Sequence, residues 1–120
     1  MLSEIEDVRQ ITGEPHRRWF CDSEFDLIVW LFPDSSPMGF QLCYHDGMDE
    51  KALTWTTDHG YTHNRVDDGE NRPARPKMTP ILVPDGVFHR DHVLDVLIPA
   101  SAEVEPAIRD FVVGKLRAMA

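Results

Sequence analysis

Four short apolar runs between residues 17 and 57 constrain the fold of this chain more than any other feature. They are rich in aromatic and β-branched residues, and spacers containing Asp, Ser, Gly and Pro separate them. Apolar runs bounded by such turn-forming residues are typical of strands joined by hairpins. The runs cover residues 19–21, 25–32, 40–44 and 52–56. The sequence therefore predicts an antiparallel β-meander.

The two faces of this meander differ in character. The run at 25–32 is apolar on both faces, which is typical of a central strand covered on both sides. The other long runs alternate more strictly, so one face of the sheet is apolar core and the other is mixed. Because residues two apart on a strand share a face, we can list the members of the mixed face. The candidate binding residues on it are Trp30, Phe32, Gln41, Cys43 and His45.

The mixed face needs some form of cover. A surface that holds Trp and Phe beside Gln, Cys and His is too apolar to be left exposed to water, and too polar to be buried as ordinary core. The chain offers one strongly amphipathic helix, and the fully apolar face of the sheet already requires it. We therefore expect the mixed face to form a subunit interface, or a groove for a small apolar ligand or partner.

The N-terminal residues predict a short helix at 3–12. Ser3 followed by Glu6 fits a helix N-cap with a reciprocal glutamate at the third helical position. Gly13 is a typical stop signal. We expect this helix to cover an edge of the sheet, because its apolar stripe is narrow.

The C-terminal half predicts one further strand and two more elements. Residues 79–83 form a short β-type run that ends in a turn. Residues 87–98 are ambiguous between helix and strand, and helical spacing of their apolar residues favours a helix closed by Pro99. A helical apolar face over 104–119, with Pro106 in the first turn, predicts a C-terminal helix packed on the sheet.

Residues 64–77 contain only two apolar side chains, so we expect a mobile loop there. The sequence then predicts an α+β fold in one domain spanning residues 1–120. Its sheet is an antiparallel meander of about five strands, with the C-terminal helix packed on one face and the short N-terminal helix at an edge.

Composition excludes several classes of protein. No apolar run approaches the roughly 20 residues of a membrane helix, and the acidic N-terminus lacks the order of a secretory signal. We therefore expect a cytoplasmic protein that binds no membrane. The formal net charge of −9 argues against a nucleic-acid partner, because phosphate binding requires a basic face.

Two pairs of histidines are the candidates for a metal site. His59 and His63 flank one short segment, and His89 and His92 flank another. Imidazole nitrogens from two such pairs can hold a metal ion, yet no established metal-binding motif is present. Surface histidines are the default interpretation.

Nucleophilic catalysis finds little support. Cys43 and His45 share a face, but their Cβ atoms are about 6–7 Å apart on an extended strand. Cys21 and Cys43 would flank a common neighbouring strand, about 9–10 Å apart, so we expect free thiols. The chain contains no serine elbow and no phosphate-binding glycine loop, and we assign no catalytic residue and no cofactor.

Two functional hypotheses follow. The first is a small binding or interaction protein that forms a homodimer through the mixed face. The alternative is a small enzyme or metal-binding protein that uses the two histidine pairs.

Overall fold

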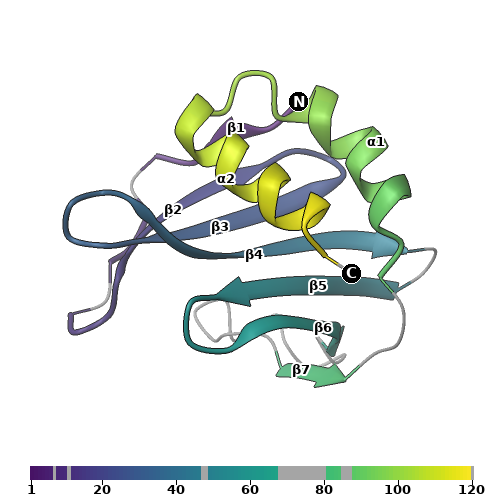
Figure 1. Cartoon of the computed structure of the whole chain (residues 1–120), viewed down its shortest axis with the longest axis horizontal. Coiled ribbons are helices and arrows are strands. Elements are labelled where there is room, and N and C mark those ends of the chain that lie inside the picture. Colours follow the sequence, from purple (N-terminus) through teal and green to yellow (C-terminus); the bar gives the residue numbers. More distant parts are fainter. Residues whose placement is uncertain (7, 11, 47–48, 68–80, 85–87, 120) are drawn as a thin grey trace.

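The protein folds as one antiparallel sheet followed by two helices (Figure 1). The computed structural model describes residues 1–6, 8–10, 12–46, 49–67, 81–84 and 88–119. The strands are β1 (Ser3–Glu4), β2 (His16–Cys21), β3 (Phe25–Leu31), β4 (Pro37–Asp46), β5 (Asp49–Thr56), β6 (Gly60–Asp67) and β7 (Ile81–Pro84). The helices are α1 (Arg90–Ala100) and α2 (Pro106–Arg117).

The sheet is a meander in which every strand pairs with the next along the chain. Six strands, β2 to β7, form the meander itself, and the two-residue β1 pairs with the outer edge of β2. The predicted antiparallel meander is thus confirmed, although it has more strands than the expected five. The additional strands are β1 and β6. β1 lies where a helix was expected, and the second half of β6 lies where a loop was expected.

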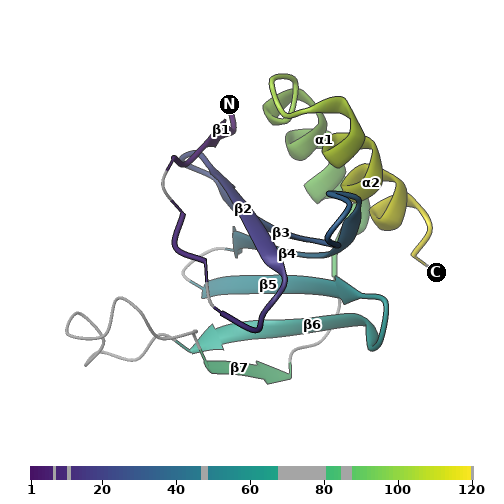
Figure 2. The ribbon, with the colours of Figure 1, turned by 90° about the vertical axis from the view of Figure 1, so that its left-hand side faces the viewer.

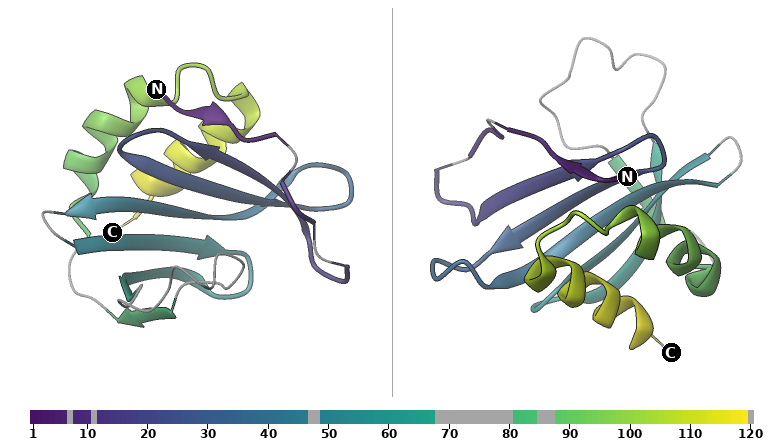
Figure 3. Two further views of the ribbon diagram at one scale, coloured as in Figure 1. Left: turned by 180° about the vertical axis from the view of Figure 1, so that it is seen from behind. Right: turned by 90° about the horizontal axis from the view of Figure 1, so that it is seen from above.

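Both helices lie on the same side of the sheet (Figures 2 and 3). The C-terminal helix was predicted there, and it begins at Pro106, whose missing N–H is tolerated in the first turn. The helical interpretation of 87–98 is also correct, since α1 spans Arg90–Ala100. Pro99 lies inside the last turn of α1 instead of closing the helix before it.

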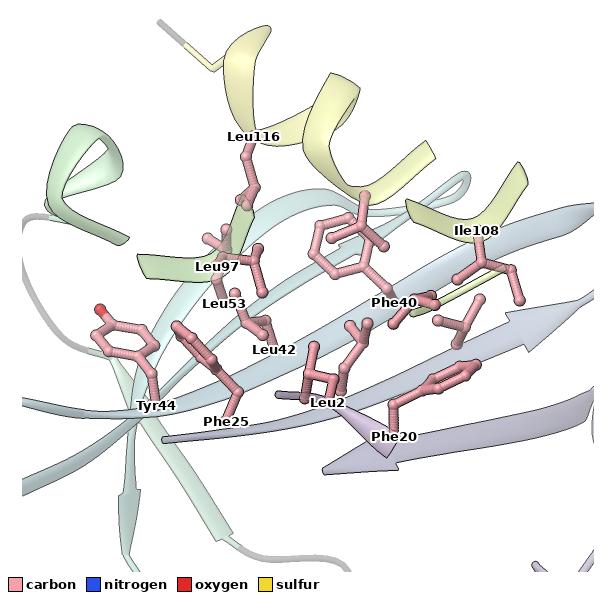
Figure 4. Packing of buried hydrophobic residues seen from close by; sticks show 14 of the residues in the cluster. Leu2, Phe20, Phe25, Phe40, Leu42, Tyr44, Leu53, Leu97, Ile108 and Leu116 are labelled. Carbon is pink, nitrogen blue, oxygen red and sulfur yellow. The ribbon is translucent and has the colours of Figure 1, made fainter. Parts of the chain in front are cut away.

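The core fills the space between the helices and the facing side of the sheet (Figure 4). Its sheet residues follow the period of two that the sequence shows, and its helix residues follow the helical period. The buried members are Leu2, Phe20, Phe25, Leu27, Val29, Leu31, Phe40, Leu42, Tyr44, Leu53, Val93, Leu94, Leu97, Val104, Ile108, Val112 and Leu116.

The predicted N-terminal helix is wrong. Ser3 and Glu4 form β1 against Cys21 and Phe20, and the pairing continues where the N–H of Ile5 donates to the carbonyl of Trp19. The capping-box pattern is a local signal worth about 1 kcal/mol. Pairing with an open strand edge, together with full burial of the Leu2 side chain, outweighs it.

The predicted loop at 64–77 begins too early. Residues 64–67 belong to β6, where Asn64 is paired with both Ala52 and Pro84. Pairing of the backbone on both sides stabilises a strand whose side chains give little apolar burial. Residues 68–77 lie outside the described residues.

Neither helix of the described chain is long and apolar enough to cross a membrane.

Candidate functional site

The side of the sheet that points away from both helices forms what we call the open face. Strand pairing arranges its side chains in three rows across β2, β3, β4 and β5. The first row is Arg17–Trp30–Gly39–Thr56, the middle row is Trp19–Ile28–Gln41–Thr54, and the last row is Cys21–Asp26–Cys43–Ala52.

Three apolar side chains form the centre of the open face at β2 and β3. Trp19 and Ile28 are directly paired, and Trp30 lies one row away. All three are only partly buried. The indole N–H of Trp19 donates to Asp26 Oδ1 at 3.3 Å, so its polar group is already satisfied within the chain. What this centre presents to its surroundings is therefore mainly apolar ring and methyl surface.

The residue paired with Trp30 on β4 is a glycine. Gly39 pairs with Trp30, and a Cβ atom at Gly39 would lie only 2.6 Å from the carbonyl oxygen of Trp55. A side chain at this position would force the backbone to shift. The indole of Trp30 thus lies beside a position that carries no side chain.

Toward β5 the open face becomes more polar, and its side chains there are largely buried. Gln41 is 8% exposed and its Nε2 donates to Thr54 Oγ1 at 3.2 Å. Cys43 is 9% exposed, and Ala52 beside it is fully buried. The amide of Gln41 is bonded to Thr54, and the Cys43 thiol donates to Gln41 Oε1 at 4.0 Å. The buried polar groups of Gln41 and Cys43 therefore have partners within the sheet and are not offered to a ligand.

The thiol of Cys43 is poorly suited to nucleophilic chemistry. Burial, and then the negative charges of Glu50 and Asp26, raise its pKa from 9.0 to about 12. The thiolate is the reactive form of cysteine, and this environment suppresses it near neutral pH. His45 on the same strand is exposed.

The two ends of the open face carry opposite charges. Arg17 lies in the first row, and its Nε donates to the carbonyl of Arg9 at 2.9 Å. Asp26 lies in the last row, beside Asp22 and Glu50, which line the same small cleft. Burial acts to raise the pKa of Asp22, but hydrogen bonds from backbone N–H groups and from the N-terminal ammonium outweigh it and lower that pKa.

The structure places the five predicted binding residues in different settings. Trp30, Gln41, Cys43 and His45 share the open face, although they extend along it over several rows. Phe32 lies beyond the end of β3, after an irregular pairing at Trp30 and Leu31, and is 38% exposed.

The prediction of binding residues omitted Trp19 and Ile28. The alternation of Arg17, Trp19 and Cys21 along β2 was the signal that could have placed Trp19 on this face. The alternation along residues 25–32 does place Ile28 on the same face as Trp30, but Ile28 was not included among the candidate binding residues.

The four histidines of the metal hypothesis are divided among three elements. His59 is in the turn between β5 and β6, His63 is on β6, and His89 and His92 are at the start of α1. No group of three or more His, Cys, Asp or Glu side chains among the described residues could hold a metal ion.

His63 instead packs against the rings of Tyr44 and Phe88 at the edge of the core. A 2.5 Å hydrogen bond joins its Nε2 to the hydroxyl of the buried Tyr44. The two rings stack with centroids 6.0 Å apart, and Phe88 meets the His63 ring at 5.4 Å. A buried tyrosine normally needs a hydrogen-bond partner, and His63 supplies one.

A cleft of about 590 Å³ separates the N-terminal segment from β2. At its far end the side-chain amide of Gln10 donates to the carbonyl of Arg17 and accepts from the N–H of Arg17, both at 2.9 Å. This amide pairs with the strand as another backbone would. It thereby shields the edge of β2 from pairing with another chain.

Comparison of the chain with protein-family models, curated proteins and solved structures found no match. The fold and the open face define a small α+β protein in which both described helices, α1 and α2, lie on the same side of the sheet. Arguments about function therefore rest on the geometry of that face.

Proposed function

We propose that this protein is a binding protein that self-associates through the open face, forming a two-fold symmetric dimer. One observation carries the proposal. The partly exposed side chains of Trp19, Ile28 and Trp30 lie together on a sheet face that neither α1 nor α2 covers. Adjoining apolar side chains of this size at a surface are typical of interaction sites.

The charge distribution favours a second copy as the partner. Arg17 and Asp26 lie two rows apart on neighbouring strands, which corresponds to about 13 Å along the sheet. A two-fold axis lying in the interface along the middle row would bring the Arg17 end of one copy opposite the Asp26 end of the other. The face is therefore complementary to itself, as an isologous interface requires.

The shape of the open face at its Asp26 end disfavours a small molecule as the ligand there. The cleft at its Asp26 end measures only about 20 Å³. Pockets that bind drug-sized ligands are typically about 300–1,000 Å³. The larger cleft of about 590 Å³ lies between the N-terminal segment and β2, at the edge of the sheet. The apolar centre and charged ends of the open face itself fit a protein surface better.

Replacing Trp30 by Ser tests the proposal. We expect the unchanged protein to sediment as a dimer, and the Trp30→Ser variant to sediment as a monomer that remains folded. Val96→Ser is the matched control, because Val96 is 39% exposed on α1, away from the open face. A protein that is monomeric with and without the change, and that loses several kcal/mol of unfolding free energy, would show that Trp30 is plain core.

A charge exchange tests the symmetry of the interface. Arg17→Glu and Asp26→Lys should each weaken association, and the double variant should recover part of it, because each end then meets the opposite charge again. Additive losses in the double variant would rule out this pairing of the two ends.

We also infer a cytoplasmic setting and no nucleic-acid partner. Cys21 and Cys43 are both free thiols, which persist in a reducing compartment. The net charge of −9 leaves little basic surface for phosphate contacts. The alternative function, an enzyme or metal-binding protein that uses the histidines, gains no support from the described residues, and elemental analysis of the purified protein tests its metal-binding form.

A further inference from the structure

Three aromatic rings from three elements meet on the helix-bearing side of the sheet. The ring of Trp55 on β5 lies 5.6 Å from that of Phe111 on α2 and 6.4 Å from that of Tyr61 on β6, measured between centroids. Trp55 and Phe111 are partly buried and Tyr61 is 38% exposed. This group, which we call the aromatic cluster, is thus reachable from solvent.

A lysine of the same chain places its ammonium group on the aromatic cluster. Lys115 Nζ lies 4.0 Å from the centroid of Trp55 and 5.8 Å from that of Phe111. The hydroxyl of Tyr61 donates to the backbone carbonyl of Lys115 at 2.6 Å, which holds the end of α2 against the sheet. The negative faces of aromatic rings attract cations, so this position favours positive charge.

We propose that the aromatic cluster is a binding site for an organic cation of the quaternary or methylated ammonium class, which takes the position of the Lys115 ammonium. Methyl groups on nitrogen reduce the hydration of a cation and add apolar contact with the rings. For these reasons aromatic groups of this kind recognise such ligands. The site lies on the opposite side of the sheet from the open face and does not depend on the proposed dimer.

Displacing Lys115 should be easy. An exposed contact between an ammonium group and an aromatic ring corresponds to only about a two- to fivefold preference. Lys115 is in the last turn of α2, where the carbonyl end of the helix still attracts its charge after the ring contact is lost. The net charge of −9 also raises the local concentration of cations around the protein.

The test is a titration with choline, followed by the amide and indole resonances of the protein in solution. Its neutral isostere, 3,3-dimethylbutan-1-ol, has the same shape without the charge. Sodium chloride keeps the ionic strength constant. We expect saturable shifts at the Trp55 indole and near Tyr61 with choline, and at least roughly fivefold weaker binding of the isostere.

Variants at the end of α2 distinguish two effects on choline binding: occupation of the site by the Lys115 ammonium, and the general positive charge of this helical turn. Lys115→Ala should tighten choline binding by about two- to fivefold, because the competing ammonium is gone. Arg117→Ala is the matched control, since it removes one positive charge from the same helical turn without touching the rings. Trp55→Leu should abolish the choline-induced resonance shifts. If the Trp55→Leu variant does not fold, Tyr61→Leu serves the same purpose.

Three outcomes would overturn the proposal. The first is the absence of saturable shifts in Lys115→Ala. The second is equal binding of choline and its isostere, which would indicate a merely apolar surface. The third is that Arg117→Ala tightens choline binding as much as Lys115→Ala does, which would mean that the gain comes from general electrostatics.

Discussion

The hydroxyl of Tyr44 illustrates how single polar contacts stabilise the edge of the core. It is hydrogen-bonded to His63 Nε2 at 2.5 Å, and its side chain is 7% exposed. Replacing His63 by Leu removes that partner and should lower the unfolding free energy by about 1–3 kcal/mol. The loss should be smaller when Tyr44 is already Phe, because no buried hydroxyl then loses its bond. Urea unfolding of the two single variants and the double variant measures the difference, and simple additivity would contradict the coupling.

The buried thiol of Cys43 should make stability depend on pH in the alkaline range. Burial raises the pKa of this thiol to about 12 in the folded protein, against an ordinary value of 9.0. Between these two pH values the unfolded chain loses the proton and the folded chain keeps it, so stability falls as the pH rises. Below pH 9 this contribution is fully present.

Comparison with a Cys43→Ala variant isolates that effect from other groups that titrate in the same range. The unchanged protein should lose more unfolding free energy than the variant between pH 8 and pH 11, measured by urea unfolding. Parallel pH profiles for the two proteins would show that the Cys43 thiol does not carry this dependence.

At the scale of elements, α2 attaches to the sheet chiefly through one row of side chains. Ile108, Val112 and Leu116 are buried at successive turns, whereas Phe111 beside them is only partly buried. Leu116→Ala should therefore lower the unfolding free energy by about 2–5 kcal/mol, because it opens a cavity in the core. Phe111→Ala should cost less, since the ring packs at the rim against Trp55 and Phe40. Urea unfolding compares them, and a larger loss for Phe111 would place the centre of the attachment at the aromatic cluster.

The edge of the sheet depends on a segment with little apolar content. β1 is two residues long, and the pairing beyond it relies on Ile5 and on the side-chain amide of Gln10. The guanidinium of Arg18 adds ion pairs to Glu4 and Glu105, and its hydrogen bonds lower the pKa of Glu4. Exposed ion pairs contribute little to stability, so burial of Leu2 provides the main attachment of this segment.

At the scale of the whole molecule, self-association would link stability to concentration. A dimer that forms only from folded chains stabilises the folded state by mass action. The melting temperature should then rise over a roughly hundredfold range of protein concentration, and it should stay constant in the Trp30→Ser variant. Differential scanning calorimetry measures both. A constant melting temperature in the unchanged protein, at concentrations where sedimentation shows one species, would count against the dimer.

Local pattern was sufficient for much of the architecture. The alternation of side chains from residue 25 to residue 56 predicts the strands, their order and the division into a core face and a mixed face, because a period of two is a property of every strand. Pro106 and the helical spacing after it likewise predict α2. These features are set by neighbours in the sequence, and they required no knowledge of distant contacts.

Only the tertiary structure decided which distant segments meet. The residues around Ser3 carry a local helix signal, yet they pair with β2 because an open strand edge offers backbone partners that a short isolated helix cannot match. The contact of His63 with Tyr44, and the meeting of Lys115 with Trp55, join residues whose sequence spacing shows no relation. Pattern also did not place α1 on the same side of the sheet as α2. Such contacts depend on how the whole sheet twists and packs, which is a property of the folded chain and not of any local segment.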